Sequence, residues 1–314
     1  MRHSYELTEV KEMKASFRPV ALVNITNRCN LKCKHCFVFR EGTPNTPTKN
    51  EMPVEKMINE IKKYKKKHGI QRMLWMGGEP LLRKDVLKVG VKLFPMNVIA
   101  TNGTLPLFNL GPSIKWAVSI DGPEEINDEI RGKGSFKKII YNLKHLPNDF
   151  TGDLQCSCAV TKMNEDYLED LIMELQETHA RGVTFSFYVP KKNDTSEFIW
   201  NSLEERDVVI KKVLALKKKY PNFILNNKLV FELLLSQNAL EVTNNCPLKK
   251  YTLPLYLGDE GFETPFCCYG NDVNCDLCGA WGAFHLAAVI KANPGFPNNI
   301  TGSYKKVSPS DIIV

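Results

Sequence analysis

The sequence predicts an α/β protein built on an open, parallel, partial (β/α)6 TIM barrel with a small Cys-rich C-terminal extension. Between Pro19 and about Pro190, short runs rich in β-branched and aromatic residues alternate with helical patterns. Strands joined by connections of crossover length pair in parallel. Six such units are too few for a closed eightfold barrel and more than a minimal nucleotide-binding half contains.

The elements of this barrel can be placed in order. Six runs bounded by turn residues predict strands over residues 20–26, 72–78, 97–103, 114–121, 154–160 and 182–189. Apolar periodicity between them predicts helices over residues 54–67, 83–94, 134–146 and 164–180. Asn164 is expected to cap the last helix, because acidic residues fill the turn behind it.

Beyond Pro190 the pattern changes. Residues 203–219 and 229–240 predict two further helices, whereas residues 244–285 are rich in Cys, Gly and Pro without clear periodicity. The chain therefore divides into an N-terminal segment, a barrel core, a helical connector, and a Cys-rich region with its tail. Their ranges are 1–18, 19–190, 191–243 and 244–314.

The composition is that of a globular protein, with 43% hydrophobic and 25% charged residues. The sequence shows no membrane span of roughly 18 apolar residues and no apolar signal-peptide core, so a cytoplasmic protein is expected. The net charge of +7 is concentrated in lysine runs at 62–67 and 217–219, where helical patterns end. Cations suit the negative end of the helix dipole, so we expect solvated helix ends and no nucleic-acid partner.

Ten cysteines in a chain of 314 residues without an export signal indicate metal or cluster ligation rather than a disulfide frame. Cys29, Cys33 and Cys36 directly follow the first predicted strand. A structural zinc site closes its shell with four protein ligands, whereas a [4Fe–4S] cluster held by three cysteines leaves one iron open to a small molecule. A redox-active C-x-x-C pair would leave Cys29 without a role.

Polar residues follow the next predicted strands at their carboxyl ends, where parallel α/β folds carry their chemistry. They are Gly77, Gly78, Glu79, Asn102, Ser119 and Asp121, with Arg131 further along the chain. The glycines permit close backbone approach, and the Glu79 carboxylate can hold an ammonium group. The set offers an acceptor for an amine, polar groups for a ribose and a guanidinium for a carboxylate, as an amino acid joined to a nucleoside requires.

Three of these residues also have a purely structural interpretation. Glu79 can cap the helix that follows it, and Asp121 can be a turn residue, since Asp-Gly is a common turn signal. Arg131 can be a surface charge paired with Glu124 or Glu125.

These motifs resemble the radical S-adenosylmethionine (SAM) superfamily. Its C-x-x-x-C-x-x-C motif matches Cys29, Cys33 and Cys36, and its GGEP motif matches residues 77–80. The stretch TNGT…SIDGPEE…RGKGSF is similar to the MoaA-like, SPASM/twitch branch. The resemblance covers roughly residues 18–190, with three motifs in order at compatible spacing.

The resemblance implies a residue-by-residue role for the site. The three cysteines would bind three irons of a [4Fe–4S] cluster, and the fourth iron would take the SAM amino and carboxylate groups. His35 would pack near the adenine rather than act as a base. The remaining SAM contacts would be Gly77, Gly78 and Glu79 at the methionine amine, Ser119 and Asp121 at the ribose, Arg131 at the carboxylate, and Asn102 beside them.

The implied activity is that of an oxygen-sensitive enzyme. An electron from the reduced cluster would cleave SAM to a 5′-deoxyadenosyl radical, which would take hydrogen from a substrate, and a flavodoxin or ferredoxin would supply the electron. We expect a peptide or protein side chain as substrate, although 28 residues before Cys29 are too few for a leader-binding domain. A lipid or isoprenoid comes second, because the tail resembles adenosylhopane synthase-type enzymes. A small biosynthetic intermediate is close behind.

Five C-terminal cysteines predict a second metal centre: Cys246, Cys267, Cys268, Cys275 and Cys278. Such a loop-rich segment buries too little apolar surface to hold together without a staple. The layout resembles the auxiliary-cluster extensions of the same branch, with enough cysteines for one further [4Fe–4S] cluster on three of them and either Cys267 or Cys268. A zinc site or free thiols are the alternatives.

Two observations complete the set of alternatives. Cys156 and Cys158 alternate on a predicted strand and are expected to be buried there, a ligand or thiol role inside the barrel being the alternative. A function of another class, a zinc-binding interaction protein, explains the cysteines and the basic charge. It does not explain GGEP at a strand end or six strand–helix units.

Overall fold

One sheet organises the chain. The computed structural model describes residues 17–40 and 51–293, so most of the expected N-terminal segment and the tail from residue 294 lie outside the described residues. The sheet has the strand order β6-β5-β4-β3-β2-β1-β7-β8. The first six strands are β1 (Val20–Asn24), β2 (Arg72–Met76), β3 (Met96–Thr101), β4 (Ile114–Ser119), β5 (Asp153–Val160) and β6 (Val183–Phe187). Neighbouring strands among these six are parallel, which confirms the open parallel barrel.

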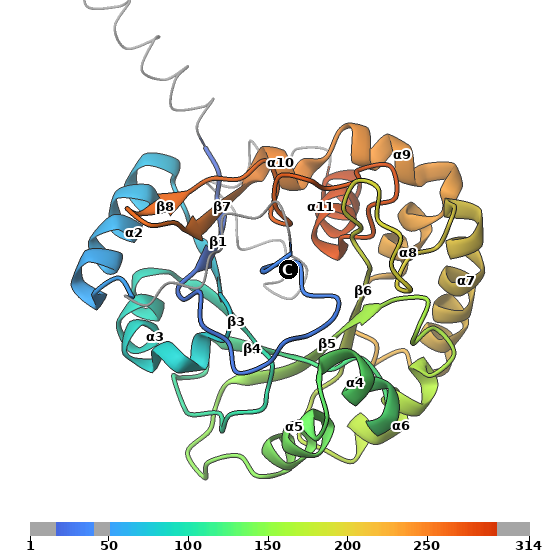
Figure 1. Ribbon diagram of the computed structural model, residues 1–314, viewed down its shortest axis with the longest axis horizontal. Helices are drawn as coiled ribbons and strands as arrows, with labels where there is room; N and C mark the ends of the chain where they lie inside the picture. The colour runs from blue at the N-terminus through green and yellow to red at the C-terminus, as the bar shows by residue number, and fades with distance from the viewer. Residues whose placement is uncertain (1–16, 41–50, 294–314) are drawn as a thin grey trace, which may run out of the picture.

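The strands curve around a central space and the helices lie outside them (Figure 1). Large side chains on the outer face of the sheet, such as Trp75, Trp116 and Phe185, are completely buried beneath the helices. Side chains alternate along a strand, so the other set lines the interior. In β4 this inner set is Lys115, Ala117 and Ser119.

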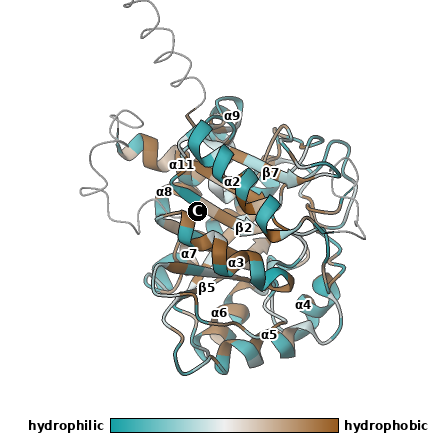
Figure 2. Ribbon diagram, turned by 90° about the vertical axis from the view of Figure 1, so that its left-hand side faces the viewer, coloured by the Kyte–Doolittle hydropathy of each residue, from teal (hydrophilic) through white to brown (hydrophobic). Residues whose placement is uncertain are grey.

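The outer helices follow the predicted periodicity. They are α2 (Val54–His68), α3 (Lys84–Gly90), α4 (Glu124–Arg131), α5 (Ser135–Lys144), α6 (Leu168–Gln176) and α7 (Leu203–Lys219), with short 3-10 turns at Pro80–Arg83 and Val91–Leu93 around α3. Both lysine runs occupy the last turns of α2 and α7, as expected. The outward face of α2 is hydrophilic (Figure 2).

The structure corrects two predicted helices. Asn164 is not an N-cap, because α6 begins only at Leu168 and Asn164 lies fully buried before it. The Asn164 amide donates to the Asp121 carbonyl at 2.8 Å, so it holds two connections together instead. The predicted helix 229–240 is two helices, α8 (Lys228–Leu234) and α9 (Ser236–Asn244). The break has a cause: the Asp207 carboxylate accepts from the Ser236 amide at 2.8 Å and starts a new helix there.

The region expected to be irregular completes the barrel. It forms α10 (Pro247–Tyr251), β7 (Thr252–Leu257), β8 (Phe262–Glu263) and α11 (Trp281–Ala292). β7 pairs in parallel with β1, and β8 is antiparallel to β7. Strand β7 was not predicted for two reasons. It is buried throughout, so its sequence lacks the alternation of polar and apolar residues, and Pro254 within it resembles a turn signal.

Helices α10 and α11 lie between the two open edges of the barrel, at β7 and β6 (Figure 1). The Phe187 amide donates to the Gly279 carbonyl at 3.0 Å, and the Trp281 amide donates to Ser186 Oγ at 3.1 Å. The C-terminal region therefore closes the side of the interior. Among the described helices, none is both long and apolar enough to cross a membrane.

Candidate functional site

The cysteine motif lies at the carboxyl ends of the strands. The segment after β1 crosses the mouth of the barrel (Figure 1) and places Cys29, Cys33 and Cys36 on the wall of the interior cavity, which measures about 1030 Å³. The other predicted site residues that line this cavity are His35, Gly77, Gly78, Asn102, Ser119 and Arg131. Glu79 and Asp121 are fully buried just behind the wall.

The glycine pair makes room for the cysteine segment itself. A Cβ on Gly78 would stand 2.0 Å from the Arg28 carbonyl oxygen and 3.0 Å from Cys29 Cβ. A Cβ on Gly77 would stand 2.6 Å from the Thr26 carbonyl oxygen. The Gly78 amide donates to that same Thr26 carbonyl at 2.8 Å, so the two strand ends are joined at the shortest possible separation.

Glu79 links the ends of β2 and β3. Its Oε1 accepts from the Leu81 amide at 2.9 Å and from Thr101 Oγ1 at 2.7 Å, and Oε2 accepts from the Asn102 amide at 2.8 Å. The first of these bonds caps the turn at Pro80–Arg83, so the structural interpretation of Glu79 is confirmed. Burial raises the pKa of the carboxyl group against these bonds. Within the described part of the chain, Oε2 accepts one hydrogen bond, so it keeps acceptor capacity.

Asn102 connects the end of β3 to the cysteine segment. Its side-chain amide donates to Asn30 Oδ1 at 2.8 Å and approaches Cys29 Sγ at 3.8 Å. Asn30 in turn donates to Thr104 Oγ1 at 2.8 Å. Sequence reasoning did not identify Asn30, whose only signal is its place inside the C-x-x-x-C spacing.

A buried ion cluster joins the cysteine segment to α4. Asp121 Oδ2 lies 2.8 Å from His35 Nε2 and 2.6 Å from Arg131 Nε. Arg131 therefore pairs with Asp121 rather than with Glu124 or Glu125. Burial alone would raise the pKa of Asp121, but the charges of Arg131 and His35 outweigh burial and lower this pKa well below its usual range. His35 Nδ1 is buried without a hydrogen-bond partner among the described residues.

The three motif thiols influence one another. Burial raises the pKa of Cys33 to about 11, while the Arg131 charge opposes this rise, and Cys29 and Cys36 add to it. Burial likewise raises the pKa of Cys29, and Cys36 contributes. Three mutually coupled thiols facing one cavity, beside a guanidinium that favours their ionised form, fit a negatively charged iron–sulfur cluster.

A single metal ion fits these thiols less well. Zinc holds its thiolates at about 2.3 Å, which crowds them around one point. Within residues 17–40 and 51–293, no group of three or more His, Cys, Asp or Glu side chains is close enough to hold one ion. A four-iron cluster distributes its cysteines over separate irons and needs wider spacing.

The C-terminal cysteines form a second group beside the barrel. Burial raises the pKa of Cys278 to about 12, and the charges of Cys267, Cys246 and Cys275 add to the rise. Burial raises the pKa of Cys267 to about 11, and the charges of Cys246 and Cys275 add to it. Burial raises the pKa of Cys268, and the charges of Cys267 and Cys246 add to the rise. Cys268 lines the central cavity, which the other four C-terminal cysteines do not, so the adjacent pair differs in position.

A buried arginine holds the loop that carries two of these cysteines. Arg206 donates to the Cys278 carbonyl at 3.0 Å, to the Leu277 carbonyl at 3.2 Å and to the Leu234 carbonyl at 3.0 Å. Burial lowers the pKa of its guanidinium to about 10. This side chain fixes the position of the loop relative to α7 and α8.

The remaining two cysteines lie on β5, and Cys156 lines the interior cavity. Cys156 and Cys158 on β5 are 1% and 0% exposed, which confirms the expectation that they are buried. Burial raises the pKa of both thiols far above the ordinary value.

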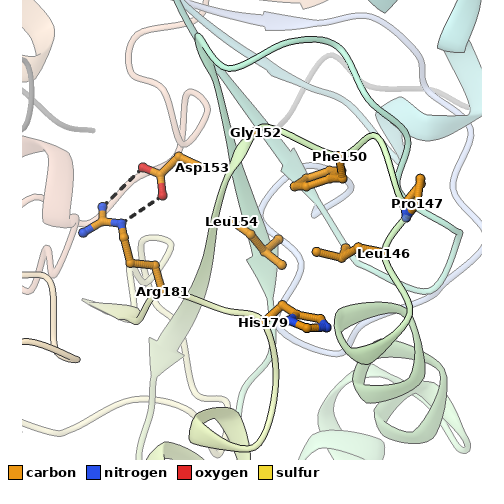
Figure 3. A pocket seen from close by; sticks show the side chains of 8 residues that line it. All are labelled: Leu146, Pro147, Phe150, Gly152, Asp153, Leu154, His179 and Arg181. Carbon is orange, nitrogen blue, oxygen red and sulfur yellow. Dashed lines mark hydrogen bonds and ion pairs between the residues drawn. The ribbon is translucent and has the colours of Figure 1, made fainter.

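A second, open depression lies at the opposite end of the barrel, at the start of β5 (Figure 3). It contains His179 and the ion pair of Asp153 with Arg181, whose Nε lies 2.9 Å from Asp153 Oδ1. None of the motif residues lines it, so the interior cavity is the candidate site.

Comparison with known proteins identifies the domain that contains this site. Residues 23–175 match the family model described as the Radical SAM superfamily. The chain carries a radical SAM domain. The expectation from the motifs is therefore confirmed, and the residue range includes every predicted residue of the N-terminal site.

Similar proteins share this domain over part of their length. The chain is 33% identical over 139 residues to Fe-coproporphyrin III synthase of Methanosarcina barkeri, covering 40% of this chain and 33% of that protein. It is 28% identical over 163 residues to the mycofactocin maturase MftC of Mycolicibacterium smegmatis, covering 48% and 40%. The chain thus matches about a third of the length of the first curated relatives. The radical SAM domain and these relatives identify it as an enzyme.

A solved structure shares the fold. Streptococcus suis SuiB bound to its precursor peptide SuiA superposes with a TM-score of 0.60 at 16% identity, covering 81% of this chain and 61% of SuiB. The superposed part of this chain, 81% of its length, is larger than the range 23–175 that matches the family model. The partial barrel is therefore the architecture of both chains.

Proposed function

We propose that this chain is a radical SAM enzyme in which Cys29, Cys33 and Cys36 hold a [4Fe–4S] cluster. The observation that carries the proposal is the convergence of the three coupled thiols with Gly78 and Asn102 on one cavity of the radical SAM domain. When bound, the cluster and SAM supply a 5′-deoxyadenosyl radical that takes hydrogen from a substrate, while the barrel supplies position and dryness.

The protein's own residues would hold SAM by hydrogen bonds and charge. Oε2 of Glu79 retains an acceptor position for the methionine amine, and Gly77 and Gly78 leave the wall open beside it. Arg131 lines the cavity with its charge directed toward Cys33, which suits the SAM carboxylate. His35 Nδ1, with no other partner among the described side chains, suits the adenine region, and Ser119, Asn102 and Asp121 are the proposed neighbours of the ribose.

Asp121 would act from behind the wall. It is fully buried and already engaged with His35 and Arg131. Its proposed role is therefore to orient those two side chains, which line the cavity, with any ribose contact passing through its neighbours.

We also propose a second [4Fe–4S] cluster on Cys246, Cys267, Cys275 and Cys278. Support comes from the raised pKa values of Cys267 and Cys278, to which the charges of Cys246 and Cys275 contribute, and from the position of Cys268 on the central cavity. Such a cluster would staple α10 and α11 to the barrel edge.

For the substrate, we propose a peptide or protein side chain. The maturase MftC is a relative by sequence, and SuiB, which shares the fold, is described bound to a precursor peptide. A small biosynthetic intermediate, as the similarity to Fe-coproporphyrin III synthase suggests, and a lipid or isoprenoid are the alternatives. Low-potential electrons would come from a flavodoxin or ferredoxin in the cytoplasm, where ten unpaired cysteines stay reduced.

The test is anaerobic reconstitution followed by iron and sulfide counting and an assay for 5′-deoxyadenosine with SAM and dithionite. We expect about eight irons per chain and deoxyadenosine. The triple variant Cys29→Ala, Cys33→Ala, Cys36→Ala should retain about four irons and form no deoxyadenosine. Cys156→Ala, a buried cysteine of β5 that belongs to neither group, is the matched control for iron content and should retain about eight irons. Deoxyadenosine from the triple variant would overturn the proposal.

The second cluster has its own test in the adjacent cysteine pair. Cys267→Ser should lose about four irons per chain, whereas Cys268→Ser should lose none. Equal iron in the two variants would refute the assignment of Cys267, and zinc in place of the second set of irons would favour the alternative metal.

A further inference from the structure

The cavity continues past the site toward the amino-terminal ends of the strands, where Lys115 and Thr252 line it. Apolar side chains of β1 to β4 line much of its wall: Leu22, Leu74, Val98, Ala100 and Ala117. Polar side chains come from β4, β5, β6, β7 and α11: Lys115, Gln155, Thr184, Thr252 and Trp281. A cavity with apolar walls and a cation is suited to a molecule with an apolar body and an anionic end.

Lys115 carries a charge that the protein neutralises only in part. Its ammonium lies 4.0 Å from Asp153 Oδ2, beyond hydrogen-bond distance, and the side chain is 15% exposed. Asp153 already accepts from Arg181 at 2.9 and 3.2 Å (Figure 3) and from Gln155 Nε2 at 2.6 Å. In the described parts of the chain, Asp153 is the one carboxylate paired with Lys115.

Further positive charge surrounds this ammonium. Burial lowers the pKa of Lys115 to about 8; Asp153 opposes the fall, and the charges of Arg72 and Arg181 add to it. Burial lowers the pKa of His285 on α11 to about 4, and the charges of Arg72 and Lys115 contribute to the fall, so this imidazole stays neutral at pH 7. The groups facing Lys115 from β2, β5, α11 and the connection before β6 therefore leave a net positive region.

Two unsatisfied polar atoms also belong to side chains that line this cavity. Trp281 stacks on His285 with ring centroids 4.7 Å apart, and its indole N–H is buried without a partner among the described residues. Thr252 Oγ1, on the strand that closes the barrel, is likewise buried and unpaired in the described structure. Buried polar atoms without partners are costly, so they are expected to meet a ligand.

We propose that the lower end of the cavity is a carboxylate-binding subsite for the substrate, with Lys115 as the cation and the Trp281 indole as a hydrogen-bond donor. This inference rests on the proposed function, because the subsite shares its cavity with the cysteine motif. Lys115 lies four residues before Ser119 on β4, about 13 Å at the rise of a strand. A substrate whose carboxylate contacts Lys115 must therefore carry that carboxylate at the tip of an extended, mainly apolar group about this long.

Two sources can present such a group: a small carboxylic acid, or the inserted C-terminus of a peptide. An acidic side chain on a peptide held at the mouth is too short to span this distance. The subsite therefore narrows the substrate to an acid whose charged end enters first.

The test measures binding directly on the reconstituted enzyme, by ¹⁵N NMR of the tryptophan indoles. The chain has four tryptophans, and the variant Trp281→Phe assigns the signal of Trp281. Hexanoate should shift that signal saturably at pH 7, and its neutral isostere hexanamide should not. Lys115→Met should weaken hexanoate at least tenfold, Lys115→Arg should retain it, and the exposed control Lys138→Met should leave it unchanged. Binding should weaken above pH 8 as Lys115 loses its proton.

A second titration identifies the source. An acetylated apolar pentapeptide acid that binds with the same dependence on Lys115, compared with its C-terminal amide, assigns the subsite to a peptide terminus. Binding of hexanoate alone assigns it to a small acid. Equal binding of acid and amide, or full binding by Lys115→Met, overturns the subsite. The titration does not depend on SAM cleavage. If hexanoate does not bind but deoxyadenosine is still formed, the subsite proposal is wrong and the proposed function stands. If no deoxyadenosine is formed, the proposed function is wrong, whatever the titration shows.

Discussion

Replacing Asp121 by Asn tests whether the buried ion cluster behind the site is needed for folding. The substitution keeps the shape of the side chain and removes the charge that faces Arg131 at 2.6 Å and His35 at 2.8 Å. Arg131 is 8% exposed, so its guanidinium would stay buried without a counter-charge. Breaking such a pair costs about 3–5 kcal/mol. For a chain of 314 residues that lowers the melting temperature by roughly 5–8 °C.

The pH dependence gives the same prediction a second readout. The folded-state pKa of Asp121 is lowered, so its contribution is complete above the unfolded value of about 3.9 and is lost as the pH falls toward the folded value. Urea unfolding of the apoprotein at pH 7 and at about pH 2.5, below the unfolded value, should therefore show a smaller difference for Asp121→Asn than for the unmodified chain.

The matched control is Glu124→Gln in the neighbouring helix. Glu124 pairs with Lys137 at 2.9 Å, but both side chains are largely exposed, and exposed pairs contribute about 0–1 kcal/mol. A loss below 1 kcal/mol for Asp121→Asn, equal to that of Glu124→Gln, would refute the reasoning from burial.

Two further substitutions test how the cysteine segments are held. Gly78→Ala places a Cβ 2.0 Å from the Arg28 carbonyl oxygen, so the Cys29 segment must move. We expect less than half the iron of the N-terminal cluster and a decrease of about 1–3 kcal/mol in the free energy of unfolding. In the control Gly261→Ala the nearest atom is 3.5 Å from the new Cβ, so neither the iron content nor the urea midpoint should change. Arg206→Met removes three hydrogen bonds to carbonyls; we expect a loss of about 3 kcal/mol and faster release of iron from the C-terminal group to a chelator, while Met in place of the exposed Arg181 should leave iron release unchanged.

The sequence predicted the six barrel strands because their signals are local. Each strand is a short apolar run between turn residues, and the helix over residues 203–219 has the predicted bounds because Ser202 caps it and lysines end it. The break at Leu235 has no local signal. It depends on Asp207, which is distant in sequence, accepting from the Ser236 amide.

The cysteine site was predictable in its residues but not in its connections. Spacing alone brings Cys29, Cys33 and Cys36 to one strand end, because the end of β1 and the short loop fix them together. The link from His35 through Asp121 to Arg131 is different. It joins the segments that follow β1 and β4 to α4, and their proximity follows from the pairing of β1 through β4, so no sequence window contains it.

The adjacent cysteines show why some choices require a backbone. Sequence alone left Cys267 and Cys268 equivalent. The structure places Cys267 in a tight turn, where its amide donates to the Gly270 carbonyl at 3.2 Å and its carbonyl accepts from the Gly270 amide at 3.0 Å. Gly270 has a φ of 103°, which a residue with a side chain rarely adopts. Cys268 lies within the turn that Gly270 permits and lines the central cavity, whereas Cys267 at the start of the turn does not, and this difference depends on a turn closed three residues further along the chain.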